Sequence, residues 1–201
     1  MKILIVAPVI WPFQSPRSFR STELAKELAR NHQVTLFSNT RGADYSEFEK
    51  EFGLDVKPFK QLKFIKKHAV HNEKNTFLNK VFNKLFRKVL NFPNIEFLWN
   101  IPKSLKNESG YDILISIAYP YPVHFGVARA KKKNPNLTQT WIADCGDPFA
   151  GEQEGRLKNP FYYKMIEKWF CLQPDYITIP IKEAITSYLS ICHHKLKVIP
   201  I

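Results

Sequence analysis

Short apolar runs rich in β-branched residues alternate along this chain with segments of helical spacing, and this alternation constrains the fold most. The first run is residues 2–7, and residues 33–38 form a second. Between them, in residues 18–30, apolar side chains recur every three or four positions, as on one face of a helix. A strand, a helix and a strand form a βαβ unit with a right-handed crossover. The sequence therefore predicts two parallel strands at its start, the first of them with the apolar run expected of a strand buried on both faces of a parallel sheet.

The same alternation continues to the end of the chain. Regular β and α alternation predicts an α/β fold: a Rossmann-like doubly wound parallel sheet with helices on both faces. No linker divides residues 1–201, so we expect a single domain. Further strands are predicted near residue 56 and at 111–117, 138–143, 176–180 and 197–199, with helices at 45–51, 76–90, 124–133, 161–172 and 182–189.

The chain is strongly basic, and much of the charge is local. Its formal net charge is +12, and residues 60–88 hold nine basic residues against one acidic residue. Such a charge favours polyanions or anionic lipid but says nothing about the fold. No apolar run approaches the ~18–20 residues that cross a bilayer, and the N-terminus lacks a signal-peptide cleavage site. We therefore expect a cytoplasmic protein.

Three cysteines, Cys145, Cys171 and Cys192, are odd in number and widely spaced. This pattern favours free thiols in a reducing compartment over a disulfide framework. Cys192 is followed by His193 and His194, but no second pair stands at metal-ligand spacing. We therefore predict no metal site and place these three residues in a surface loop.

Ligands of doubly wound sheets bind beyond the carboxyl ends of the strands. This rule selects the loops at residues 8–18, 119–124, 144–154 and 181–183. The first loop contains no glycine, which excludes a dinucleotide Gly-x-Gly-x-x-Gly motif, and Gly-Lys-Ser/Thr occurs nowhere in the chain. An anion site at a helix N-terminus remains, formed by Ser15 with Arg17 or Arg20. Alternatively, both arginines are solvated residues at the start of a helix.

The order and spacing of several segments over nearly the whole chain resemble the N-terminal half of family 4 glycosyltransferases of the GT-B architecture. The segments are residues 1–8, 23–29 with 32–35, 111–116, 141–144 with 147–149, and 176–180 with 197–200. Two positions depart from the family. Gln14-Ser15-Pro16 replaces a glycine pair, and Asp144-Cys145-Gly146-Asp147 stands where the family often places a histidine.

The resemblance implies an enzyme of two facing domains, of which this chain is the N-terminal domain that binds the acceptor. It implies the acceptor-binding domain of a nucleotide-sugar-dependent glycosyltransferase that makes a cell-surface polysaccharide or glycolipid by hexosyl transfer. The C-terminal donor-binding domain is absent from the chain, so we expect this domain alone to be inactive. The expected partners are a nucleotide-sugar co-substrate, a glycan or lipid-linked acceptor and the missing domain; no cofactor and no metal are expected.

Asp147 and Asp144 are the predicted catalytic residues. Carboxylates at this edge can accept hydrogen bonds from sugar hydroxyls or orient an acceptor hydroxyl as a base. Gly-Asp-Pro is also a common turn sequence, which explains Asp147 equally well.

Four further residues near the same edge are predicted to bind substrate: Tyr119, Tyr121, His124 and Glu183. Tyrosine rings suit stacking on sugars. Packed tyrosines in a proline-linked turn, a helix cap at His124 and a helix-start charge at Glu183 are the alternatives.

Residues 76–90 form a predicted amphipathic helix within a basic insertion at about residues 60–90. Its apolar residues recur at three- and four-residue steps, and its basic residues gather on the other side. Packing on the sheet is one interpretation, and docking on an anionic membrane surface is the other. The predicted membrane-binding residues are Lys80, Lys84, Arg87 and Lys88.

The alternative function is a non-catalytic basic module that binds nucleic acid or another polyanion, with strong salt dependence. Residues 60–88 contain no recognised nucleic-acid motif, and their aromatic residues stand at core spacing. Under the leading hypothesis no nucleic acid is therefore expected as a partner.

Overall fold

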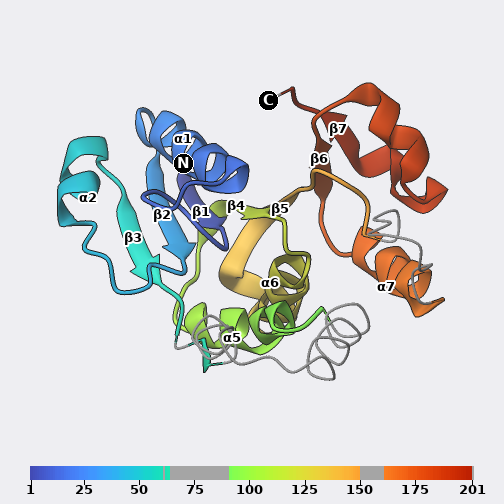
Figure 1. Cartoon of the computed structure of the whole chain (residues 1–201), viewed down its shortest axis with the longest axis horizontal. Coiled ribbons are helices and arrows are strands. Elements are labelled where there is room, and N and C mark those ends of the chain that lie inside the picture. The colour runs from blue at the N-terminus through green and yellow to red at the C-terminus, as the bar shows by residue number, and fades with distance from the viewer. Residues whose placement is uncertain (61, 64–90, 150–160, 201) are drawn as a thin grey trace, which may run out of the picture.

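All seven strands of the central sheet run parallel in a computed structural model of the chain, which describes residues 1–60, 62–63, 91–149 and 161–200 (Figure 1). The strands are β1 (Lys2–Val6), β2 (Gln33–Ser38), β3 (Asp55–Pro58), β4 (Tyr111–Ile117), β5 (Thr138–Asp144), β6 (Tyr176–Ile179) and β7 (Leu196–Val198). The α-helices described are α1 (Pro16–Ala29), α2 (Ser46–Phe52), α5 (Phe97–Ser104), α6 (Pro122–Lys133) and α7 (Tyr162–Cys171). Short 3₁₀ helices are η1 (Asn94–Glu96), η2 (Pro135–Leu137), η3 (Lys182–Ser187) and η4 (Ser190–Lys195).

The strand order is β3-β2-β1-β4-β5-β6-β7, which confirms the predicted doubly wound α/β architecture. Ile3 of β1 pairs with Val34 of β2 on one side and with Ile113 of β4 on the other. The winding direction reverses between β1 and β4, so the loops that follow these two strands leave the sheet in opposite directions. A crevice at the carboxyl edge forms at such a point.

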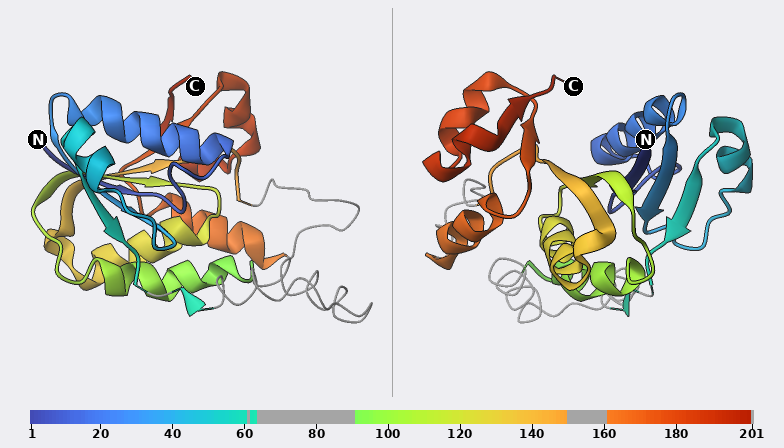
Figure 2. Two further views of the ribbon diagram at one scale, coloured as in Figure 1. Left: turned by 60° about the vertical axis from the view of Figure 1, so that its left-hand side comes forward. Right: turned by 180° about the vertical axis from the view of Figure 1, so that it is seen from behind.

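Successive side chains along each strand point to opposite faces of the sheet, and each face has its own core. Leu4 and Val6 belong to a cluster that includes residues of α5, α6 and α7. Ile3 and Ile5 pack with residues of α1 and α2. Figure 2 shows α1 on one side of the sheet and α5, α6 and α7 on the other.

Helix α1 begins at a well-formed cap. The Ser15 hydroxyl accepts a hydrogen bond from the backbone N–H of Ser18 at 3.1 Å, and Pro16 occupies the first turn, where its missing N–H costs nothing. The buried residues of α1 are small (Ser18, Ser21, Thr22 and Ala25), so its backbone lies close to the sheet. Within the described residues, no helix is long and apolar enough to cross a membrane.

Two described helices differ from the sequence prediction. Helix α5 was not predicted, because Pro102 stands inside it and proline usually breaks helices. The predicted helix at 182–189 is the 3₁₀ helix η3, which suits a short segment containing β-branched Ile185 and Thr186. The predicted helix at 76–90 lies outside the described residues.

The prediction of three free thiols is wrong. Cys171 of α7 and Cys192 of η4 form a disulfide with their Cα atoms 5.2 Å apart, and both residues are buried. The predicted surface loop at Cys192 is therefore also wrong. Only Cys145 is free. Sequence spacing could not show this, because the fold of β6 and η3 brings the two cysteines together.

We predict that the protein, denatured without reductant, titrates one thiol instead of three. Replacing both bonded cysteines (Cys171→Ser with Cys192→Ser) should lower the free energy of unfolding by roughly 3 kcal/mol, since the disulfide closes a loop with a sequence separation of 21. Urea unfolding measures this loss. The single substitution Cys145→Ser should leave the thiol count at zero, and three reactive thiols in the wild-type protein would contradict the pairing.

Candidate functional site at the carboxyl edge of the sheet

Three of the predicted loops meet at the carboxyl edge of the sheet. Arg17, in the first turn of α1, lies across Gly146 in the loop after β5, so closely that a Cβ on Gly146 would come within 2.0 Å of Nη2 of Arg17. The hydroxyl of Tyr121, at the start of α6, donates a hydrogen bond to the backbone carbonyl of Asp147. The loops after β1, β4 and β5 therefore form one continuous surface.

Arg20 and Asp144 form a buried ion pair that ties α1 to the sheet. Nε and Nη2 of Arg20 each lie 2.6 Å from one carboxylate oxygen of Asp144. The Thr178 hydroxyl of β6 donates to the same carboxylate at 2.7 Å. The Asp144 side chain is 5% exposed, and its hydrogen bond raises the pKa of Arg20. Asp144 was predicted to be catalytic and Arg20 to bind phosphate. In the structure the two side chains bind each other instead.

We predict that Asp144→Asn lowers the free energy of unfolding by roughly 3 kcal/mol, because it leaves the half-buried Arg20 guanidinium without its counter-charge. Glu27→Gln is the matched control, since the Glu27–Arg30 pair is exposed and such pairs contribute less than about 1 kcal/mol. Urea unfolding compares the two variants. Equal losses would show that the Arg20–Asp144 pair does not hold α1.

His124 lies in a linear series of buried hydrogen bonds that runs from Trp141 to Cys145. The Trp141 indole donates to the Ser116 hydroxyl at 2.8 Å, and that hydroxyl lies 2.8 Å from Nδ1 of His124. Nε2 of His124 lies 3.3 Å from the Cys145 sulfur. The Ser116 hydroxyl has one proton and two acceptor lone pairs, so it can accept from the indole and pair with either tautomer of the neutral His124 ring.

Both His124 and Cys145 are held neutral by burial. Loss of solvation lowers the pKa of His124 to about 3, against a smaller opposing effect of Asp144, and it raises the pKa of the Cys145 thiol. Because burial lowers the pKa of the imidazole and raises that of the thiol, proton transfer from Cys145 to His124 is unfavourable, and these residues do not form a nucleophile–base pair. The fully buried His124 ring also presents no surface to a substrate, contrary to its predicted role.

We predict that the ring of His124 stays neutral between pH 7 and pH 4. The unfolded chain takes up its proton near pH 6.5 and the folded protein only near pH 3, so stability falls as pH falls through this window, by at most about 1.4 kcal/mol per pH unit. NMR titration of the ring carbons measures the protonation state. A midpoint near 6.5 would contradict the buried arrangement.

The other predicted residues lie at or near this edge in different environments. Tyr121 is buried, and burial raises its pKa, so it packs within the core and does not stack on a ligand. Tyr119 is 39% exposed at the rim. Asp147 and Glu183 are exposed, and Ser15 is used as the cap of α1. The catalytic role of Asp147 and the binding roles of Ser15, Tyr119 and Glu183 remain predictions.

The predicted membrane-binding residues Lys80, Lys84, Arg87 and Lys88 lie outside the described residues, as does the part of the loop after β5 from 150 to 154. No group of three or more His, Cys, Asp or Glu residues is placed to hold a metal ion in the described part of the chain.

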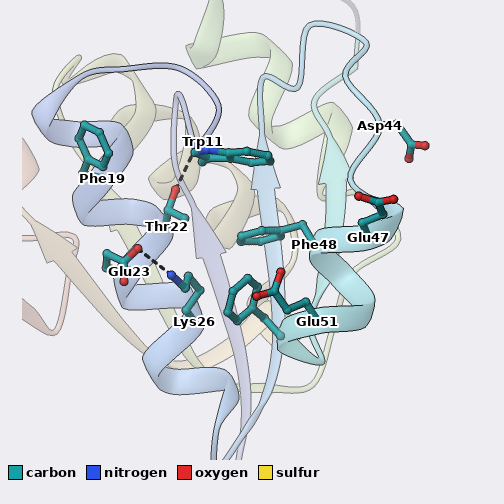
Figure 3. Close-up of a pocket in the computed structure, with 10 residues that line it drawn as sticks. Trp11, Phe19, Thr22, Glu23, Lys26, Asp44, Glu47, Phe48 and Glu51 are labelled. Carbon is teal, nitrogen blue, oxygen red and sulfur yellow. Dashed lines mark hydrogen bonds and ion pairs between the residues drawn. The ribbon is translucent and has the colours of Figure 1, made fainter.

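A separate groove of about 450 Å³ lies between α1 and α2 (Figure 3). Trp11 stacks on Phe48 with ring centroids 6.2 Å apart. The ammonium of Lys26 lies 2.9 Å from a Glu23 oxygen and 4.7 Å from the centre of the Phe52 ring. The lining residues are Trp11, Phe19, Thr22, Glu23, Lys26, Asp44, Glu47, Phe48, Glu51 and Phe52.

This groove has the opposite charge to the chain as a whole. Four carboxylates (Glu23, Asp44, Glu47 and Glu51) line it against the single ammonium of Lys26, although the net charge of the protein is +12. Its field repels anions, so it is not a second anion site. Sequence reasoning missed the groove. The acidic stretch at 44–51 was a visible signal, but only the packing of α2 beside α1 places it near Trp11.

The chain matches no known family model, and no curated protein matches it. Among solved structures, it is similar to pyridoxal kinase from Entamoeba histolytica at 12% identity and a TM-score of 0.34, covering 92% of this chain and 52% of that one. It is also similar to a ligand-bound lysine-to-alanine variant of O-ureido-L-serine synthase at 12% identity and a TM-score of 0.26, covering 81% of this chain and 49% of that one. The chain thus spans about half the length of each.

These comparisons correct the predicted family. No glycosyltransferase model matches, and the two structures named above are a kinase and a synthase, so the assignment to the GT-B glycosyltransferases is wrong. The physical reason is that the resemblance rested on strand and helix segments in order, which any doubly wound sheet shares. At TM-scores of 0.34 and 0.26, neither structure contributes to a functional assignment.

Proposed function

We propose that this domain binds a small phosphate-bearing molecule at the carboxyl edge of its sheet, with Arg17 as the residue that holds the phosphate. The observation that carries the proposal is the position of the Arg17 side chain. It lies over Gly146 at the crevice beside the point where the winding reverses, and no described residue forms an ion pair with it.

Within the described residues, Arg17 has no counter-ion. Its neighbour Arg20 is neutralised by Asp144, so the two arginines of the first α1 turns have different roles. A guanidinium presents paired N–H donors that match phosphate geometry, and the N-terminal end of α1 adds a positive partial charge. Arg17 is half-buried against the β5 loop, so part of its side-chain entropy is already lost before a ligand binds.

Asp147 supports a catalytic role for the same site. Its side chain is exposed at the rim, while Tyr121 holds its backbone carbonyl in place. In this proposal Asp147 accepts a proton from a hydroxyl of the bound molecule. Asp144, His124 and Cys145 act by fixing the loops and do not touch the ligand.

We predict that Arg17→Ala weakens binding of inorganic pyrophosphate about 10- to 100-fold, which corresponds to the loss of charge-assisted hydrogen bonds of about 1.5–3 kcal/mol. Backbone-amide NMR titration of the full chain measures the affinity and identifies the site, because the amides of Arg17 and Gly146 should shift. Arg30→Ala, which removes an exposed arginine at the other end of α1, should leave the affinity unchanged.

Gly146→Ala provides a second test that keeps all charges. Its Cβ would displace the Arg17 guanidinium, and Gly146 does not have a left-handed φ, so the backbone tolerates alanine. Weaker pyrophosphate binding with unchanged urea unfolding is the expected result. If both Arg17→Ala and Gly146→Ala bind as tightly as the wild type, the proposed site is excluded.

Two predictions remain beside this proposal. A basic module for nucleic acid or another polyanion depends on residues 60–88, most of which lie outside the described residues. Peripheral attachment to an anionic membrane was predicted from the same segment. The exposed apolar residues of α7 support membrane attachment at a different surface.

A further inference from the structure

Helix α7 exposes large apolar side chains on its outer face. Phe161, which directly precedes the helix, is 83% exposed, and Met165, Trp169 and the following Leu172 are 65%, 43% and 56% exposed. These four residues are spaced at intervals of four, four and three, so they form one stripe along the helix. We call them the α7 stripe.

The opposite face of α7, which is mainly apolar but also buries Glu167, already packs on the sheet. Tyr163, Phe170 and Cys171 are buried in the core, and the disulfide to Cys192 anchors the end of the helix. A surface helix normally turns a polar face to solvent. Since the inner face accounts for the fold, the α7 stripe is not needed for packing within the described protein.

Two exposed lysines border the α7 stripe along one side. Lys164 and Lys168 are exposed one turn apart, and at 3.6 residues per turn they and the stripe together span about 140° of the helix. A third group of positive charge lies near the C-terminal end of α7, where Lys131 of α6 forms an ion pair of 3.1 Å with Asp175 and leaves Lys132 and Lys133 exposed. The α7 stripe is therefore bordered by lysines along one side, with further lysines of α6 near its C-terminal end.

We propose that the α7 stripe docks on an anionic lipid surface, with α7 lying along the membrane. Phe, Met, Trp and Leu side chains on a convex helix enter the boundary between headgroups and acyl chains, while flanking lysines contact lipid phosphates. The charge of the flanking residues favours anionic over neutral lipid, and the chain's net charge of +12 acts in the same direction. This surface is independent of the phosphate site at Arg17.

The test is co-sedimentation of the full chain with vesicles of phosphatidylcholine containing 30% phosphatidylglycerol, compared with pure phosphatidylcholine. The wild-type protein should bind the anionic vesicles, and the tryptophan emission should shift to the blue. Phe161→Ser combined with Met165→Ser should weaken partitioning at least tenfold. Both residues are mainly exposed, so unfolding in urea should not change.

The controls are on the opposite face of the sheet. Phe19→Ser removes a 55% exposed phenylalanine from α1 and should not affect binding.

A second comparison tests the charges. Lys164→Gln with Lys168→Gln on α7 should weaken binding several-fold. Lys50→Gln with Arg30→Gln removes equal charge from α2 and the end of α1 and should have a smaller effect. Equal effects of both charge pairs would show attraction by net charge without docking.

Three results would overturn the proposal. The first is failure of the wild type to bind anionic vesicles. The second is binding that survives the α7 substitutions but is lost on replacing Lys80, Lys84, Arg87 and Lys88 by Gln, which would assign docking to the basic insertion. The third is a dimer that the α7 substitutions dissociate in light scattering, without vesicle binding, which would assign the stripe to a second copy of the chain.

Discussion

The buried pair between Arg20 and Asp144 is the contact on which the candidate site depends. It joins the first turns of α1 to the end of β5, and Thr178 extends the connection to β6. With Arg20 held in this way, Arg17, one turn earlier, is directed over Gly146. A bidentate pair with low exposure has one favoured geometry, so it fixes the position of the helix start as well as its distance from the sheet. The ion pair thereby connects the start of α1 to the loop after β5 at the carboxyl edge.

The buried polar groups behind this edge act in the same way. Ser116, His124 and Cys145 form hydrogen bonds with one another inside the core, and each partner satisfies a group that would otherwise be costly to bury. His124 resembles a catalytic residue by type and by place in the chain. Its full burial and its neutral state make it a structural element that fixes α6 against the β5 loop.

Three surfaces of the molecule differ in chemistry because different elements form them. The carboxyl edge presents an arginine, the groove between α1 and α2 presents carboxylates and aromatic rings, and the outer face of α7 presents apolar side chains beside lysines. A chain with a net charge of +12 is therefore not uniformly basic. Each surface therefore favours a different kind of partner, since the electrostatic field near a protein depends on the charges within about a Debye length.

The secondary structure followed closely from local pattern. Residues 33–38 and 111–117 are strands with the bounds that the sequence predicts, because both segments are rich in β-branched and aromatic residues, which favour strands. Helix α5 was missed because local rules treat Pro102 as a breaker. Its stability comes from close contact with α6, where Gly126 approaches the backbone of Phe97 so closely that a Cβ would come within 2.5 Å of the carbonyl oxygen.

By itself, the sequence determined the fold class and the edge of the sheet at which polar loops gather, because both follow from periodicity and from the rule for parallel strands. It could not determine which charged groups at that edge are free. Asp144 and Arg20 are separated by 124 positions, and Cys171 and Cys192 by 21, so their pairing depends on distances that only the folded chain sets. Tertiary structure alone decided that Arg20 is engaged, that His124 is buried and that the outer face of α7 is uncovered, since burial and pairing are properties of contacts between distant segments.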